Sequence, residues 1–323
     1  MGVLRVGVLA YPRCFASEVY GVPDLLTMAT HLGGPDRTGY EVSVVSPRRH
    51  VTASGGARLA VSAVRDVDVL VVPGFELSPD VRLDTTLAPL GPELAVIRSH
   101  VATGNAVVSI CVGAFLLAEA GLLAGRRATT SWVFADELAR RCPDADVRAE
   151  QLVVTDGGVT TTGSFSAMYD FALGLIREHS GTSVARATAR LALVDDARSS
   201  QTPYVDARLL PQAGSEFSRE VMRHLDQHLA DRYDLTALAA AFKVSTRTLL
   251  RRFADETRQS PLDYLQASRV SRARHLLETT DRTIASISTT VGYKNPGTFA
   301  ALFTRHTGQP PSTYRTAFRR SST

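Results

Sequence analysis

The 323-residue sequence is poor in cysteine and has no long hydrophobic run. Its three cysteines are unevenly spaced, so they form neither a disulfide framework nor paired zinc ligands, and they suit a reducing compartment. The apolar stretch at residues 3–9 is interrupted by Arg5 and is too short for a signal peptide or a membrane span. The sequence therefore predicts a cytoplasmic protein with no membrane partner, no metal and no other cofactor.

Length and charge indicate two domains of different character. The chain is long enough for two domains and a linker, and each domain has room for its own core. From Glu216 onward, 17 Lys and Arg stand against 10 Asp and Glu, a net charge of +7, whereas the preceding part has 19 against 22, a net charge of −3. A basic domain joined to an acidic one is typical of a DNA-binding module attached to a domain that does not touch DNA.

Residues 235–314 contain an internal repeat. The offset between the two copies is 49 residues at the start and 50 after Lys294, so one turn is a residue longer in the second copy. The copies match at positions that include Leu235 with Ile284, Phe253 with Phe303, Pro261 with Pro311 and Tyr264 with Tyr314. Each copy has the pattern of two short helices around a tight turn, which predicts a helix-turn-helix, twice.

Cap residues predict where these helices begin and end. In the first copy, Thr236 is a candidate N-cap of the first helix and Ser245 caps the second. In the second copy, Thr283 caps the first helix, and Asn295 precedes a proline at the first position of the second helix. Gly308 ends that helix, because glycine suits the left-handed residue that follows a helix.

The outward face of the helix after Ser245 distinguishes a DNA-binding unit from an ordinary helical hairpin in a core. The polar residues crowded into about two turns are Thr246, Arg247, Thr248, Arg251 and Arg252. Arg247 and Arg251 lie four apart and so point the same way. A guanidinium matches the O6 and N7 acceptors of guanine, and each good bidentate contact contributes about 1 to 3 kcal/mol of discrimination. We expect these two arginines to read bases.

Residues 217–318 closely resemble the AraC/XylS DNA-binding domain. The resemblance is carried by the repeat itself, by the linking helix through Ser268, Arg269 and Ala273, and by the Val-Gly-Tyr turn at 291–293. It implies two recognition helices on one face of the domain, which enter major-groove segments about 34 Å apart. The second copy has only short outward side chains, so it is expected to contact mainly the DNA backbone. The predicted DNA-binding residues are Thr246, Arg247, Leu250, Arg251, Lys294, Asn295, Thr298 and Arg305.

The N-terminal part alternates predicted strands and helices. The predicted strands are residues 4–10, 40–46, 67–72, 105–110 and 153–159, the last with a turn at 156–158, and the predicted helices are 18–32, 93–101 and 166–176. Continuous Val, Ile and Leu runs between helical patterns indicate a parallel sheet covered on both faces. The fold prediction is a doubly wound, mostly parallel α/β domain at 1–194, a linker at 195–215, and an all-α double helix-turn-helix domain at 216–320.

Cys111 directly follows a predicted buried strand and precedes an apolar helix. Residues 109–113 therefore have the pattern of a strand-to-helix elbow, which exposes a nucleophile above a sheet. The amide dipoles at a helix N-terminus lower the pKa of a thiol and favour the thiolate. The alternative is an inert core cysteine. The elbow favours an exposed, sensitive position.

Residues 4–180 resemble the ThiJ/PfpI superfamily, specifically the class I glutamine amidotransferase-like domains fused to AraC-type modules. The resemblance is carried by residues 109–111, 114–121 and 125–130, and by Gly163-Ser164 before the last helix. It implies that Glu18 is the acidic residue that hydrogen-bonds the elbow cysteine. Hydrolytic members have a histidine where this chain has Ser131, and serine cannot take the proton of Cys111 at neutral pH. We therefore predict no hydrolysis and no catalytic residue.

Together these patterns predict a bacterial, sequence-specific transcriptional regulator of the AraC/XylS family. It binds double-stranded DNA as a homodimer, acts on the transcription machinery, and senses a small-molecule effector or an oxidant in a ligand or redox pocket formed by Glu18, Cys111 and Ser131. One alternative is a cysteine-dependent amidase, protease or glyoxalase-like enzyme with an appended DNA-binding module. Another is a purely structural dimerisation domain. The sequence also leaves open whether the linker is a hinge or packs on the first domain.

Overall fold

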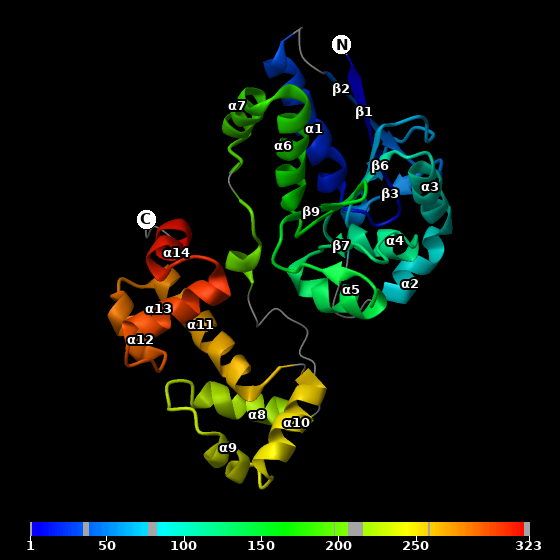
Figure 1. The fold of residues 1–323 in the computed structure, drawn as a ribbon. Coiled ribbons are helices and arrows are strands. Elements are labelled where there is room, and N and C mark those ends of the chain that lie inside the picture. Colours follow the sequence, from blue (N-terminus) through cyan, green and yellow to red (C-terminus); the bar gives the residue numbers. More distant parts are fainter. Residues whose placement is uncertain are drawn as a thin grey trace. The chain divides into compact units, whose positions relative to one another are not determined.

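The computed structural model describes residues 2–34, 39–76, 83–196, 198–205, 216–257 and 259–319. It divides into two compact units, Met1–Gln201 and Thr202–Thr323, each with its own hydrophobic core (Figure 1). Residues 206–215 of the predicted linker lie outside the described residues. The domain and linker boundaries given above stay predictions.

The first unit is built on a six-stranded sheet in the order β2-β1-β5-β6-β10-β9. Its strands are β1 (Val3–Leu9), β2 (Gly39–Val45), β5 (Val69–Val72), β6 (Ala106–Ser109), β9 (Val153–Asp156) and β10 (Val159–Thr162). All neighbouring strands pair in parallel except β9 and β10, which form an antiparallel hairpin. The predicted turn between them is present, with Gly157 and Gly158 at φ 57° and 77°. The prediction of a mostly parallel α/β sheet is confirmed.

Helices cover both faces of this sheet, as Figure 1 shows, with α1, α6 and α7 on one side and α3 and α4 on the other. The helices of the unit are α1 (Ala16–Gly33), α2 (Leu83–Leu87), α3 (Gly91–Ala102), α4 (Ala114–Glu119), α5 (Ala135–Arg141), α6 (Ala167–Ser180) and α7 (Thr182–Ala192). Two small sheets pair β3 (Val51–Thr52) with β4 (Arg58–Leu59) and β7 (Arg127–Ala128) with β8 (Asp146–Val147). Double coverage explains why the central strands are apolar on both faces.

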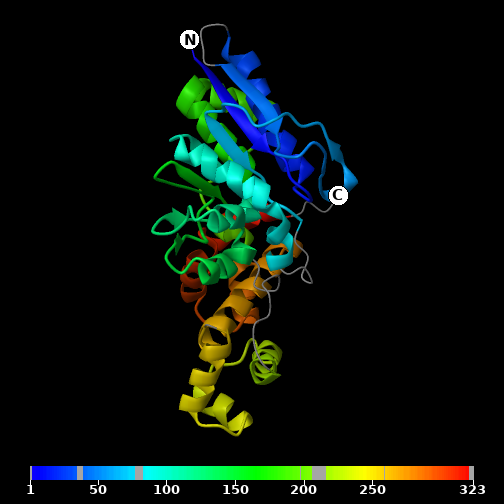
Figure 2. The same ribbon diagram turned by 90° about the vertical axis from the view of Figure 1, so that its right-hand side faces the viewer.

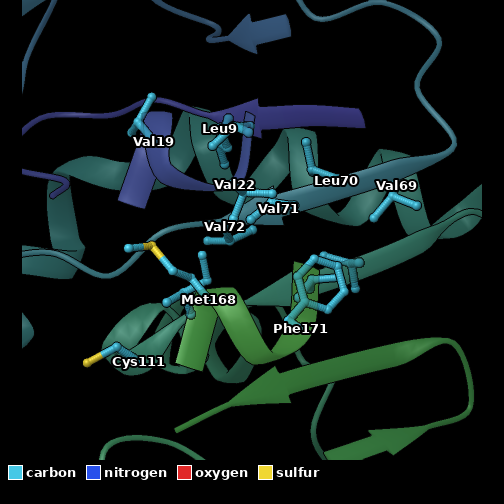
Figure 3. Packing of buried hydrophobic residues seen from close by; sticks show 14 of the residues in the cluster. Leu9, Val19, Val22, Val69, Leu70, Val71, Val72, Cys111, Met168 and Phe171 are labelled. Atoms are coloured by element: carbon cyan, nitrogen blue, oxygen red, sulfur yellow. The ribbon is translucent and has the colours of Figure 1, made fainter. Parts of the chain in front are cut away.

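The core of the first unit lies around β5. All four residues of this strand are at most 6% exposed, and they pack with Leu9, Val22, Met168 and Phe171 from β1, α1 and α6 (Figure 3). Cys111 belongs to the same cluster and lies toward its margin in Figure 3. The sheet therefore brings the predicted elbow to the edge of a well-packed core.

The second unit is helical and has two hydrophobic clusters joined by one long helix. Its helices are α8 (Glu216–Gln227), α9 (Leu235–Ala241), α10 (Thr246–Thr257), α11 (Pro261–Thr279), α12 (Ile284–Thr290), α13 (Pro296–Thr307) and α14 (Pro311–Phe318), preceded by a 3-10 turn, η5 (Thr202–Tyr204). Helix α11 contributes Leu265 to the cluster of α8–α10, and Val270 and Leu277 to the cluster of α12–α14. Figure 2 shows α11 as the long helix that connects these two groups.

Arg269 fixes α11 to the first helix-turn-helix group. It is 6% exposed, and its guanidinium donates to the backbone oxygens of Leu229 at 2.8 Å and Asp231 at 2.5 Å. The guanidinium carbon also lies 5.1 Å from the ring centroid of Tyr293, in the turn of the second copy. A buried arginine is stable only with its donors satisfied, so Arg269 holds both copies to the linking helix.

Four of the predicted caps are confirmed and one is wrong. Ser245, Thr283 and Asn295 accept backbone N–H groups at the starts of α10, α12 and α13, and Gly308 ends α13 at φ 74°. The N-cap of α9 is Asp234, whose carboxylate accepts from the next turn's amides, rather than the predicted Thr236. Both residue types are good caps, and the carboxylate adds a favourable interaction with the helix dipole. Among the described residues, no helix is long and apolar enough to cross a bilayer.

Candidate nucleic-acid interface and cysteine pocket

Helix α10 presents two free arginines on its outward face. Its inner face is fixed by Leu249 and Phe253, both 0% exposed, so the opposite face is turned to solvent. Arg247 and Arg251 are exposed, and neither forms an ion pair or a hydrogen bond with any residue that the structure describes. Leu250 is 36% exposed beside them. The two guanidinium groups are therefore available to an anionic or hydrogen-bonding partner.

The third arginine of α10 has a structural role. Nε of Arg252 lies 3.0 Å from Oε1 of Glu256, and its guanidinium carbon is 4.1 Å from the ring centroid of Phe217. Thr248 is also engaged, since its hydroxyl is 2.8 Å from that of the cap residue Ser245. Two of the arginines that the sequence places in this helix thus remain for recognition, together with the half-buried Thr246.

Helix α13 presents a smooth outward face. Phe299 and Phe303 are buried, and the exposed residues of its first two turns are Pro296, Gly297, Thr298 and Ala301. None of these side chains is long enough to reach far into a groove. The cap residue Asn295 uses its Oδ1 to accept the amides of Gly297 at 2.7 Å and Thr298 at 3.3 Å.

The cationic residues of the second copy flank this face. Lys294 is exposed in the turn before α13, and Arg305 is exposed near its end, where Nη2 donates to Oε1 of Gln266 at 2.8 Å. The predicted DNA-binding residues thus lie on α10 and α13, or directly before α13 in the case of Lys294 and Asn295, and the two helices share their internal packing but differ in their surfaces. The predicted separation of about 34 Å between their groove contacts stays a prediction.

Cys111 occupies a strained turn at the end of β6. It is the first residue of the 3-10 turn η3 (Cys111–Gly113) and has φ 53°, which is uncommon for a non-glycine residue. The turn is tight, because a Cβ on Gly113 would lie 2.5 Å from the backbone oxygen of Val72. Positive φ values of this kind concentrate at functional sites, where the surrounding structure holds the strain.

The expectations of an exposed position and of a lowered thiol pKa at Cys111 are both wrong. The residue is only 8% exposed, and burial raises its pKa to about 12, with the charge of Glu18 as a second cause. Hydrogen bonds from the amides of Val112 and Phe165 and from the hydroxyl of Ser131 act in the opposite direction but are weaker. Desolvation of the thiol raises its pKa by more than the dipole of the short helix after the elbow lowers it. The thiol is therefore protonated at neutral pH.

Glu18 lies on α1, is 0% exposed and faces the same turn. Its Oε2 accepts the amide of Gly74 at 2.5 Å, and its Oε1 has no hydrogen-bond partner among the described residues. Burial raises the pKa of this carboxyl to about 8, so it is mostly protonated at pH 7. A protonated Glu18 repels a thiolate less than an ionised one, and its O–H group is a potential donor into the pocket.

Ser131 is a further buried polar residue of this region. It is 6% exposed, and its hydroxyl lies 2.9 Å from that of Ser164. Its neighbour Thr130 donates to the backbone oxygen of Cys111 at 2.8 Å. The structure therefore brings the predicted Glu18, Cys111 and Ser131 together around one small polar site.

Gln201 also belongs to this region and was not predicted from the sequence; its buried side chain accepts hydrogen bonds from the amide and hydroxyl of Ser164. It lies in a polar stretch without periodicity, which gives no signal of burial. No cluster of three or more His, Cys, Asp or Glu suited to a metal ion occurs in the described part of the chain.

Two protein families match different parts of the chain. The DJ-1/PfpI family matches residues 24–178, and a helix-turn-helix domain matches residues 238–317. The HTH-type transcriptional regulator GlxA of Rhizobium meliloti is 31% identical over 221 residues, which are 66% of this chain and 65% of that protein. The isonitrile hydratase of Pseudomonas putida is 29% identical over 64% of this chain and 93% of its own length.

A solved structure agrees with the first match. The crystal structure of a ThiJ/PfpI family protein from Pseudomonas syringae superposes with a TM-score of 0.50 at 25% identity, covering 60% of this chain and 76% of that one. The two matched domains and the similarity to named regulators indicate a DNA-binding transcriptional regulator in which a DJ-1/PfpI-type α/β domain precedes the helix-turn-helix domain. The chain thus combines an AraC-type helix-turn-helix domain with a DJ-1/PfpI domain, as the two resemblances in the sequence predicted.

Proposed function

We propose that the protein binds specific operator sites mainly through α10, and that the DJ-1/PfpI-type domain adjusts this binding in response to a small molecule. The observation that carries the first part is the pair of exposed, unengaged arginines, Arg247 and Arg251, on one face of a capped helix. Side chains of this kind read guanine edges in the major groove. The second copy positions the domain on the DNA backbone through Lys294, Thr298 and Arg305.

The test is operator binding by three single variants of α10. Arg247→Ala and Arg251→Ala each remove a proposed base contact, and we expect about a 5- to 150-fold loss of affinity for the specific site. Arg252→Ala is the matched control, because it removes the same charge from the same helix at a residue held by Glu256 and Phe217. An equal loss in all three variants would show only general electrostatic attraction and would overturn the proposal.

The pocket around Cys111 favours reversible ligand binding over reaction with an oxidant. A thiol whose pKa is raised to about 12 contains little thiolate at neutral pH, and the thiolate is the form that oxidants attack. Coupling of about 1 to 3 kcal/mol between ligand and DNA binding would suffice for regulation. A thermal-shift screen of metabolites, followed by operator binding with each stabilising compound, tests this part. Stabilisation without any change in operator affinity would contradict it.

We also infer that the α/β domain dimerises and so pairs two DNA-binding modules on repeated half-sites. The regulator then contacts the transcription machinery from a defined position on the DNA. Sedimentation of the full chain, with and without a DNA fragment that carries two half-sites, tests the stoichiometry. One protein chain on such a fragment at saturation would contradict the inference.

An enzymatic function is the second candidate, because the relative named isonitrile hydratase matches 64% of this chain over 93% of its own length. Against it, Ser131 stands where hydrolytic members have a histidine, and the thiol of Cys111 is protonated at neutral pH. We infer that the protein is not an enzyme. Turnover of an isonitrile, an amide or a glyoxal substrate that is abolished in Cys111→Ala would overturn this inference.

A further inference from the structure

The last residues of the first unit are bound along its surface. Arg198 pairs with Asp170, and Nη1 of Arg198 donates to the hydroxyl of Ser166 at 3.0 Å. Further along, the hydroxyl of Ser200 donates to the backbone oxygen of Glu150 at 2.8 Å, and the amide of Gln201 donates to the same oxygen at 2.9 Å. This part of the predicted linker therefore belongs to the first unit, and it carries Gln201 into a buried position.

The carboxamide of Gln201 fills a site made almost entirely of backbone groups. Its Oε1 accepts the amides of Trp132 at 3.3 Å and Ser164 at 3.2 Å. Its Nε2 donates to the backbone oxygens of Thr130 and Ala149, each at 2.8 Å. Gln201 is 1% exposed. Donors thus face the oxygen and acceptors face the nitrogen, an arrangement that fits a primary carboxamide and disfavours a carboxylate.

The shape of the site also fits a flat amide group. A Cβ on Gly163 would lie 2.8 Å from Oε1 of Gln201, so only glycine leaves room for the carboxamide at this point. Backbone groups in a folded unit are fixed in direction, which makes the site selective for one orientation of the amide. A polar site this well satisfied is costly to empty, because its buried donors and acceptors would lose their partners.

A short chain of hydroxyl groups connects this site with the cysteine pocket. The hydroxyl of Ser164 reaches Oε1 of Gln201 at 3.3 Å and the hydroxyl of Ser131 at 2.9 Å. Ser131 lowers the pKa of the Cys111 thiol, and its neighbour Thr130 donates its hydroxyl to the backbone oxygen of Cys111 at 2.8 Å. Ser131, which stands in place of the histidine of hydrolytic members, therefore lies between the pocket and the residue that ends the first unit.

The residues that follow Gln201 in the chain are held by the second unit. The backbone oxygen of Pro203 accepts Nη2 of Arg274 at 2.7 Å, and the ring of Tyr204 meets that of Phe318 edge-on with centroids 5.4 Å apart. Release of Gln201 would thus free the chain directly before a segment attached to the DNA-binding unit.

We propose that Thr130, Trp132 and Ser164 form a carboxamide-binding site whose resident ligand is Gln201, and that this site transmits changes at the cysteine pocket to the linker. The carboxamide-binding site is inferred from the contacts of Gln201 alone. The transmission of changes from the cysteine pocket to the linker rests on the proposed sensing function. The two parts therefore need separate experiments.

Chemical rescue tests the binding site. Gln201→Ala removes a group equivalent to acetamide, and we expect the melting temperature of the full chain to fall by about 4 to 8 °C. Added acetamide should restore it in a saturable way in the variant and leave the native protein unchanged. Acetate and N,N-dimethylacetamide are the controls, because neither offers two N–H donors beside a carbonyl. An unchanged melting temperature in the variant, or equal effects of all three solutes, would overturn the proposal of a carboxamide-binding site.

Hydrogen exchange in the full chain tests the transmission. We expect Gln201→Ala and Ser131→Ala each to increase exchange of the amides at residues 199–205 at least tenfold. Thr155→Ala is the matched control, since it removes a hydroxyl that pairs with Thr160 at 2.9 Å elsewhere in the same unit. If acetamide rescues Gln201→Ala but amide exchange is unchanged in Ser131→Ala, the carboxamide-binding site is supported and the proposed transmission to the linker is contradicted. Failure to find any effector would affect neither the rescue nor these exchange rates.

Discussion

The two helix-turn-helix copies share one interior and differ on their surfaces. Leu249 and Phe253 of α10 correspond to Phe299 and Phe303 of α13, and all four are buried. The outward positions correspond as well, but Arg247 and Arg251 of the first copy are matched by Gly297 and Ala301 of the second. The two copies therefore share their internal packing. Their surfaces differ, with long cationic side chains suited to base reading in the first copy and short side chains suited to backbone contact in the second.

The turns of the two copies also differ, in the residue that adopts positive φ and in the room around it. Each turn needs a residue with positive φ, and this residue is Lys243 at φ 55° in the first copy and Gly292 at φ 89° in the second. Lys243 is exposed, so its side chain has room. A Cβ on Gly292 would lie 2.7 Å from the backbone oxygen of Ala230 and 2.9 Å from Nη2 of Arg269. The second turn is thus packed against Ala230 and Arg269, whereas the first turn is exposed to solvent at Lys243.

The largest effect should come from removing both arginines of α10. Arg247→Ala combined with Arg251→Ala should weaken binding to the specific site by about 2 to 6 kcal/mol, because two base contacts are lost together. Removal of a proposed backbone contact in the second copy, Lys294→Ala, should cost less than tenfold and lower the salt dependence of binding by about one phosphate contact. Fluorescence anisotropy at several salt concentrations measures both. Equal losses of affinity in the two copies would contradict the assignment of base reading to the first copy.

A stability difference should follow from the two turns. Gly292→Ala should lower the free energy of unfolding by about 2 to 3 kcal/mol, since the new Cβ meets Ala230 and Arg269 and the left-handed conformation adds strain. Lys243→Ala keeps the same strain in an open position, so its effect should stay within about 0.5 kcal/mol. Urea denaturation of both variants checks this. A similar loss in both would mean that the second turn is not held more tightly.

Adding a positive charge to the outward face of α13 should strengthen its contact with the DNA backbone. Ala301→Arg places a guanidinium at the position equivalent to Arg251, on a face that is exposed. We expect non-specific DNA affinity to rise by about 1 kcal/mol and the slope of affinity against salt to steepen by about 0.9. Binding to random-sequence DNA measures this gain. An unaltered salt slope would indicate that the outward face of α13 does not approach DNA.

The smallest effect concerns the strain of the first turn. Lys243→Gly should raise the free energy of unfolding by up to about 1 kcal/mol, because glycine adopts positive φ without a Cβ penalty. The gain is limited by the greater freedom of glycine in the unfolded chain. Thermal denaturation beside Lys243→Ala separates the two contributions. A Lys243→Gly variant that is less stable than Lys243→Ala would contradict the assigned strain.

Local patterns in the sequence were sufficient for most of the fold. The repeat, its caps and the alternation of buried strands with helices depend on neighbouring residues, so they are readable without tertiary information. The one wrong cap, Thr236 in place of Asp234, separates two residues that both cap well, and local rules rank them closely.

The properties of the pocket depend on parts of the chain that are distant in sequence, and this limits what the sequence predicts. The pKa of Cys111 is raised by burial and, second, by the charge of Glu18, which lies on α1 and is distant in sequence. The elbow pattern alone predicted the opposite direction. Gln201 was missed for the same reason, because its burial is created by Thr130, Trp132 and Ser164 and not by its own surroundings in the sequence.

The most direct test of the central claim is selection of genomic DNA fragments by the native protein, Arg247→Ala and Lys294→Ala at two salt concentrations. We expect one shared motif for the native protein and Lys294→Ala, with weaker and less salt-sensitive binding in the latter. Arg247→Ala should lose the motif and retain salt-sensitive binding. An unchanged motif in Arg247→Ala, or a motif lost in Lys294→Ala alone, would contradict the assignment of base reading to the first copy.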